Sequence, residues 1–367
     1  MTTSNTPRAF APDHAAPPGD LVQDYLDHLG ISARELGRRC GRSGKLMAEI
    51  ISGKAALEPE TALQLERVLD VPASIWSNME ASYQLHQARQ AEQQVLVGSH
   101  DWAKEFPLKE LATRGYIKPT TQKADQVLEV LRFFGVGSRK ACEDRIEELL
   151  DVDYRTSPTF ENDQWALAAW LRIGERRAAA IECQDYGRDA FVAALKDIRA
   201  LTLVPINDAL PEIEARCAAA GVAFVLEPAL SKTRARGVSR WLSPRKALIQ
   251  QTLRHKTDDH FWFTFFHECA HLLLHSRKAI FLDMLKGGGS AGPKEEAEAN
   301  IWAQDFLIPS AAMRGFLMRF GGTAAEVMAF AKAQRIAPGI VVGQLQHHKA
   351  LPHAALNQLK VRYAWAD

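Results

Sequence analysis

Apolar residues recur every three or four positions along most of the chain, which is the spacing of one helix face. Near the N-terminus this pattern predicts four short helices joined by tight turns. They span residues 20–29, 33–40, 43–51 and 61–69. Ser32 precedes the second helix and Glu35 follows three residues later, the signature of a capping box. Short helices with Gly41 in the turn between the second and the third are typical of a helix-turn-helix.

The middle of the chain continues the helical pattern and carries no catalytic motif that we recognise. After a predicted connecting helix at 81–97, amphipathic helices are expected at 108–114, 124–134, 138–150, 164–182 and 187–199. Beyond residue 200 the pattern changes. A helix at 211–220 is followed by three short apolar strands at 222–226, 237–242 and 247–252. The expected fold class is therefore α+β and mostly helical, with an all-α N-terminal domain and a small sheet in the C-terminal part.

Composition narrows the setting of the protein. The formal net charge of the 367 residues is +1, so any nucleic-acid binding must come from a local surface. No apolar run reaches the roughly 18–20 residues that cross a bilayer, and residues 1–18 lack the apolar core of a signal peptide. The five cysteines are scattered and form no C-x-x-C pair. These features predict a cytoplasmic protein with no membrane partner.

The candidate chemistry lies in a strongly apolar segment that contains His267-Glu268-x-x-His271. On a helix, positions i and i+4 lie on one face, so one tetrahedral metal can take both imidazoles at about 2.0–2.1 Å. Glu268 is displaced by about 100° around the helix, where a general base beside the metal should stand. Such a pattern can arise by chance. The apolar flanks favour the metal, because buried polar side chains need partners.

A second helix should return towards this motif. Residues 294–308 read as a helix with acids in its first turns, ended by Pro309, and the glycine-rich segment 286–293 predicts a flexible loop before it. The acids of this helix are the candidates for a third metal ligand. Glu295 and Glu298 would by default belong to its solvated face.

From about residue 201 to its end, the chain resembles the ImmA/IrrE-family metallopeptidases. The pieces that match are Phe-Trp-Phe-Thr-Phe-Phe-His-Glu-x-x-His, the Glu-x-Glu-Ala-Asn helix ending in Leu-Ile-Pro, and residues 336–346. The resemblance implies a zincin-like domain whose small sheet packs on the metal helix. It also implies a glutamate as third ligand, which we assign to Glu296, with Glu298 as the alternative. Asn300 then stands one turn on and could hold the carboxylate. The implied cofactor is one Zn²⁺ per chain, with Mn²⁺ as an alternative.

The segment from about Pro18 to Trp76 is similar to XRE-type DNA-binding domains and looks closest to HigA-like antitoxins of toxin–antitoxin modules. That resemblance implies that the helix beginning near Ser43 enters the major groove of operator DNA, bound by a homodimer. Four residues are candidates to hold the DNA backbone, namely Arg42, Ser43, Lys45 and Lys54. Glu49 on the same helix would repel phosphate, so a docking module that has lost DNA binding is the alternative.

We therefore expect a disordered tail (1–16), an XRE-like domain (17–80), a helical middle region (81–200) and a metallopeptidase domain (201–367). The expected function is transcriptional regulation under stress by a zinc endopeptidase that cleaves a repressor or antitoxin-like protein, or itself. A cognate toxin is the other candidate protein partner. Two alternatives stay open. The protein is a non-proteolytic HigA-like repressor with a structural or sensing metal domain, or its peptidase is latent until the middle region binds a ligand.

Overall fold

The computed structural model describes residues 15–150, 163–253, 256–276, 280–284 and 292–364. The predicted tail 1–16 and the predicted loop 286–293 lie outside these residues, apart from their last two positions. The chain divides into two compact units, residues 1–100 and 101–367. The fold class is α+β and mostly helical, as predicted. The finer domain boundaries stay a prediction.

The N-terminal unit is all helical and follows the predicted pattern. Its helices are α1 (Pro18–Leu29), α2 (Ala33–Cys40), α3 (Gly44–Ile51), α4 (Pro59–Leu69) and α5 (Ala73–Gly98). Two predicted helix starts are confirmed by their caps. The Ser32 side chain accepts the backbone N–H of Glu35, and Ser43 accepts that of Leu46. Each bond satisfies a backbone donor that the helix itself leaves without a partner.

Small residues set the distance between α2 and α3. A Cβ at Gly44 would come within 2.8 Å of the Arg34 Cα, and Gly41 takes a left-handed φ of 66° in the turn. The core below contains the fully buried Leu36 and Met47. Trp76 is buried too, but α5 does not end there as its sequence suggested. The Ala, Gln and Glu residues that follow are strong helix formers and continue it to Gly98.

The C-terminal unit surrounds one sheet with helices. Before the sheet come α6 (His100–Ala103), α7 (Leu108–Thr113), α8 (Lys123–Phe134), α9 (Arg139–Leu150), α11 (Gln164–Ala179), α12 (Arg188–Ala200) and α13 (Ile206–Ala219). Later in the chain are α14 (Asp258–Leu274), α15 (Pro293–Leu307), α16 (Ser310–Leu317), α17 (Ala324–Gln334) and α18 (Pro338–His347). The predicted helices of the middle region are confirmed to within a few residues at each end.

The sheet has four strands in the order β1-β3-β2-β4. They are β1 (Val222–Leu226), β2 (Ala235–Ser243), β3 (Lys246–Gln251) and β4 (Phe281–Met284). β1 and β3 are parallel, whereas β2 is antiparallel to both β3 and β4. The first three strands were predicted. β4 was missed, because four residues are too few to display a period of two.

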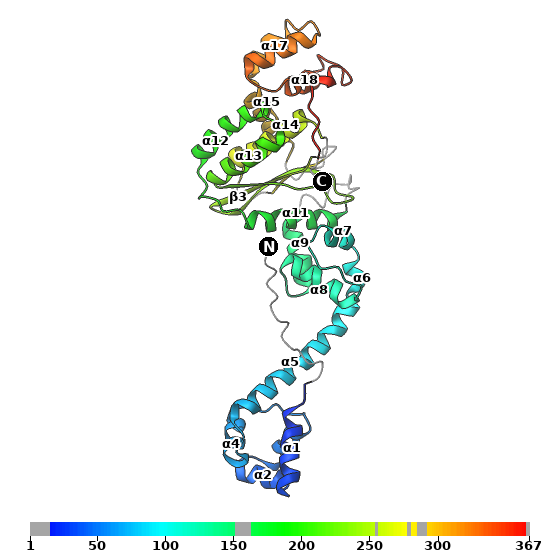
Figure 1. The fold of residues 1–367 in the computed structure, drawn as a ribbon, viewed down its shortest axis with the longest axis vertical. Helices are drawn as coiled ribbons and strands as arrows, with labels where there is room; N and C mark the ends of the chain where they lie inside the picture. Colours follow the sequence, from blue (N-terminus) through cyan, green and yellow to red (C-terminus); the bar gives the residue numbers. More distant parts are fainter. Residues whose placement is uncertain (1–14, 151–162, 254–255, 277–279, 285–291, 365–367) are drawn as a thin grey trace. The chain divides into compact units, whose positions relative to one another are not determined.

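Both faces of the sheet are covered, as Figure 1 shows. Val222 and Phe224 of β1 belong to the large core that α13 and α14 share, whereas Ala223 and Val225 pack with Ala178 of α11 on the other face. All five residues of β1 are consequently buried. This burial on two faces explains why the strand reads as a continuous apolar run rather than an alternation.

Helix α11 is bound to the sheet by buried polar contacts. Arg240 of β2 donates to the Glu175 carboxylate at 3.1 Å and to the Leu171 carbonyl at 3.0 Å. Gln250 of β3 donates to the Trp170 carbonyl at 2.7 Å, against a helix position where Gly174 leaves room for the amide. The middle region therefore supplies one layer of the fold that carries the His267–His271 motif.

Candidate metal centre

Helix α14 places both histidines of the motif inside the protein. His267 and His271 are 2% and 1% exposed, and their Nε2 atoms lie 3.0 Å apart. The helix is buried because its apolar flanks pack against α15, α18 and the sheet. The i and i+4 spacing thus brings the two imidazoles together, as expected from helix geometry.

Helix α15 brings the third candidate ligand. The Glu296 carboxylate lies 3.5 Å from Nε2 of His267 and 3.7 Å from Nε2 of His271. Among the described residues, these three side chains form a cluster whose ligand atoms lie within 4.8 Å of one another. Two imidazole nitrogens and one carboxylate oxygen are a donor set that suits zinc. The cluster could bind a metal ion, and its composition fits that role.

The electrostatic environment keeps both imidazoles neutral. Burial is the main cause that lowers the pKa of His267 to about 4 and that of His271 to about 2. A hydrogen bond with Asn300 acts in the opposite direction on the pKa of His267. At neutral pH both rings therefore keep the lone pair that metal binding requires. Asn300, expected beside the carboxylate of Glu296, thus also contacts a histidine of the cluster.

Glu268 is fully buried beside the two histidines. Its carboxylate lies against Gly237 of β2. A Cβ at that glycine would come within 2.4 Å of a Glu268 carboxylate oxygen. Glycine inside a strand often marks such a close approach. The strand therefore fixes the carboxylate from one side, a contact that the sequence did not reveal.

A third histidine, which the sequence analysis did not single out, adjoins the cluster. His275 lies one turn beyond His271, and their Nδ1 atoms are 3.0 Å apart. Its other ring nitrogen, Nε2, lies 3.2 Å from the Glu298 carboxylate. Glu298, the alternative third ligand, is thus in contact with this histidine. The i+4 spacing from His271 was the available signal, although leucine residues surround it.

The four predicted DNA contacts differ in what their side chains do. Arg42 donates to Gln64 at 2.8 Å and to Glu60 at 2.9 Å within its own unit. The Ser43 hydroxyl accepts the cap bond of α3. Lys45 is 84% exposed, 3.8 Å from Glu49, and Lys54 is exposed in the turn after α3. The two lysines are therefore the more accessible cations for a phosphate.

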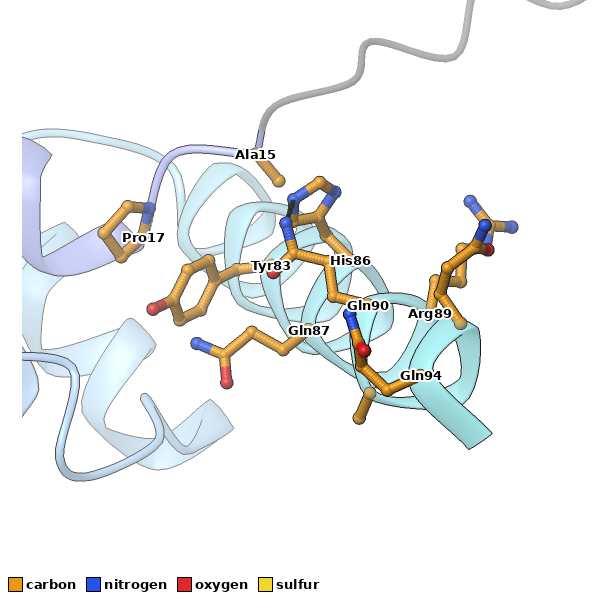
Figure 2. Close-up of a pocket in the computed structure, with 10 residues that line it drawn as sticks. Ala15, Pro17, Tyr83, His86, Gln87, Arg89, Gln90 and Gln94 are labelled. Carbon is orange, nitrogen blue, oxygen red and sulfur yellow. Dashed lines mark hydrogen bonds between the residues drawn. The ribbon is translucent and has the colours of Figure 1, made fainter. Parts of the chain in front are cut away.

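The N-terminal unit also has a surface pocket along α5, shown in Figure 2. It is lined by Ala15, Pro17, Tyr83, His86, Gln87, Arg89, Gln90, Ala91, Gln93 and Gln94. His86 and Gln90 contact each other at 2.8 Å across one helix turn. The lining is dominated by amides and contains no carboxylate, so it lacks the donor set of a metal centre.

Comparisons with known proteins divide along the chain. Residues 253–337 match the family model described as the IrrE N-terminal-like domain, of the peptidase M78 class. The N-terminal region is 35% identical over 71 residues to the uncharacterised helix-turn-helix-type transcriptional regulator YddM of Escherichia coli K12. That match covers 19% of this chain and 76% of the relative.

Two further similarities concern a smaller part of the chain. Virulence-associated protein I of Dichelobacter nodosus is 32% identical over 79 residues, which cover 21% of this chain and 73% of the relative. A solved structure assigned as an antidote protein of a plasmid maintenance system, from Nostoc punctiforme, is 25% identical. It covers 22% of this chain and 89% of its own, with a TM-score of 0.22. Each helix in the described part of the chain is too short or too polar to span a membrane.

Proposed function

We propose a function for this chain from one premise: it belongs to the helix-turn-helix-type transcriptional regulators and carries an IrrE N-terminal-like domain. The proposal is that this second domain is a zinc-dependent endopeptidase that acts in gene control. The single observation that supports it is the convergence of His267, His271 and Glu296 beside the buried Glu268. A structural metal site would not require a further buried carboxylate next to its ligands.

His267, His271 and Glu296 would hold one Zn²⁺, or Mn²⁺ in its place. A divalent metal there supplies Lewis acidity, which polarises a carbonyl group and makes water more acidic. Glu268 acts as the general base that takes a proton from the attacking water. It then returns that proton to the leaving amine. Gly237 contributes by letting the sheet close against the carboxylate, which limits its movement during proton transfer.

The edge of the sheet offers a place for a peptide substrate. β4 is the outer strand beside β2, and Phe281 of β4 stacks on the His271 ring with centroids 4.5 Å apart. An extended peptide can add to such an edge by main-chain hydrogen bonds. A substrate paired with β4 would therefore pass close to the three candidate ligands. The proposed substrate is a repressor or antitoxin-like protein, or another part of this chain.

The N-terminal unit indicates why cleavage would matter. The relatives imply DNA or a toxin as a partner. We propose that the unit binds operator DNA as a homodimer, with Lys45 and Lys54 on the phosphates, and that proteolysis relieves repression under stress. Salt dependence of operator binding would test the phosphate contacts, because each lost contact lowers the slope of log affinity against log salt by about one.

The peptidase activity is tested with the Glu268→Gln variant, and Glu295→Gln is a matched control on α15. Parent and control should cleave the full chain or a co-purified repressor, as seen by mass spectrometry. The Glu268→Gln variant should keep its metal and lose cleavage by at least about 100-fold, the scale of general-base catalysis. Equal cleavage by Glu268→Gln and the parent would contradict the mechanism.

A non-proteolytic regulator is the second candidate function. It is favoured by one observation, that both curated relatives match the N-terminal region, outside residues 253–337. In that case the protein would retain metal and operator binding, and no substrate would be cleaved by the parent under any condition tested.

A further inference from the structure

We propose that His275 and Glu298 form a hydrogen-bond relay that orients His271 and fixes which of its nitrogens faces the metal. This inference rests on the proposed metal site and adds two positioning residues to it. The relay runs from the exposed Glu298 carboxylate through His275 to His271, over contacts of 3.2 Å and 3.0 Å.

The chemistry of the contacts allows one arrangement of protons. His271 must present a bare Nε2 to a metal, so its Nδ1 carries the hydrogen. That hydrogen is donated to Nδ1 of His275, which must therefore be bare. The hydrogen of His275 then resides on Nε2, and Glu298 accepts it as a carboxylate. Every donor in the chain consequently meets an acceptor, and the tautomer of His271 is set from the surface of the protein.

Packing supports the same orientation. The side chain of His275 is only 6% exposed. Phe281 lies parallel to the His271 ring, at an interplanar angle of 11°, and its centroid is 5.2 Å from that of His275. Stacking fixes the plane of the His271 ring but does not select between its two nitrogens. The hydrogen bond from Nδ1 makes that selection, which is the usual task of a residue behind a metal ligand.

The relay also explains the position of Glu298. Glu296 and Glu298 are two residues apart on α15, so their side chains point in directions about 200° apart. One reaches the His267–His271 pair, while the other reaches the histidine behind it. A single helix would thus supply both a ligand and the carboxylate that holds a neighbouring ligand in place.

The test uses the full chain and zinc alone, with affinity measured by competition against a chromophoric chelator. His275→Phe keeps the ring but removes both nitrogens, and should weaken zinc binding about tenfold to hundredfold. His275→Asn retains an acceptor near the place of Nδ1 and should bind zinc with intermediate affinity. Glu298→Gln should weaken binding less than His275→Phe, whereas the control Glu295→Gln should match the parent.

Two readouts separate the relay from other outcomes. Nitrogen NMR of the zinc-loaded parent should show His271 protonated at Nδ1 and ligated at Nε2, and His275→Phe should lose that single pattern. Unchanged zinc affinity in His275→Phe, or equal affinities for the Phe and Asn variants, would overturn the relay. A parent that binds no zinc would refute the metal site itself, and a parent that binds zinc without proteolysis would refute only the peptidase.

Discussion

The two units of the chain are built on different kinds of contact. In the N-terminal unit, caps such as Ser43 and turns such as Gly41 act on neighbours a few residues away. In the C-terminal unit, the candidate metal centre joins α14 to α15, to β2 and to β4. The sheet beneath it is covered by α11, about ninety residues earlier in the chain. A local unit should tolerate separation from the rest of the chain, whereas a unit built on distant contacts should not.

The largest expected effect comes from cutting the chain at residue 200. A fragment of residues 201–367 lacks α11 and leaves Arg240, only 4% exposed, without Glu175. Breaking a buried ion pair costs about 3–5 kcal/mol, a large part of the 5–15 kcal/mol that stabilises a domain. We expect this fragment to unfold non-cooperatively, while fragments 15–100 and 101–367 each show a sigmoidal urea transition. A stable and more active 201–367 fragment would instead support a latent peptidase.

A pH-dependent effect is expected where the C-terminal segment joins α14. Asp258 accepts the backbone N–H of Val361 at 3.1 Å. Burial, and then the nearby Asp259, raise the pKa of Asp258 from 3.8 to about 6. Because the folded pKa is the higher one, its effect on stability is most favourable below about pH 4 and is lost as pH rises through 6.

The variant Asp258→Asn removes this titration. At pH 8 it should be more stable than the parent by roughly 1–3 kcal/mol, and the difference should shrink as pH falls to 5. Urea unfolding at both pH values measures the change. The exposed Asp197→Asn on α12 is the control. A variant less stable than the parent at pH 8 would show that the charge is better accommodated than the geometry indicates.

An added methyl group at Gly237 probes the contact between β2 and Glu268. Gly237→Ala should destabilise the C-terminal unit by about 1–3 kcal/mol, the usual cost of overpacking. It should also reduce any proteolysis more than it reduces zinc binding, since Glu268 is displaced and the ligands are not. Gly315→Ala is the control, because a Cβ there meets nothing within 4 Å. Equal thermal midpoints for the two variants would argue against the contact.

The smallest effect should come from the cap of α3. Ser43→Ala removes the bond to Leu46 and should cost about 1 kcal/mol in the unfolding of the N-terminal unit. The exposed Ser82→Ala on α5 should have no such cost, since alanine is the better helix former. An unchanged midpoint in a 15–100 fragment carrying Ser43→Ala would show that local caps contribute less there than we infer.

This contrast also explains what could be predicted from the sequence. Helix starts at Ser32 and Ser43 are encoded by neighbours, and the pairing of His267 with His271 follows from helix periodicity. The approach of Glu296 was inferred from a resemblance, because the return of α15 depends on tertiary packing. Gly237, His275 and β4 were missed. Their roles arise only when distant segments meet, and no local pattern distinguishes them.

The central claim is that His267, His271 and Glu296 bind one metal while Glu268 stays outside its coordination. Metal content per chain, measured after zinc loading and removal of excess, tests this most directly. The account predicts about one zinc in the parent and in Glu268→Gln, and far less in His271→Ala and Glu296→Ala. Full zinc content in His271→Ala, or a loss in Glu268→Gln as large as in Glu296→Ala, would contradict it.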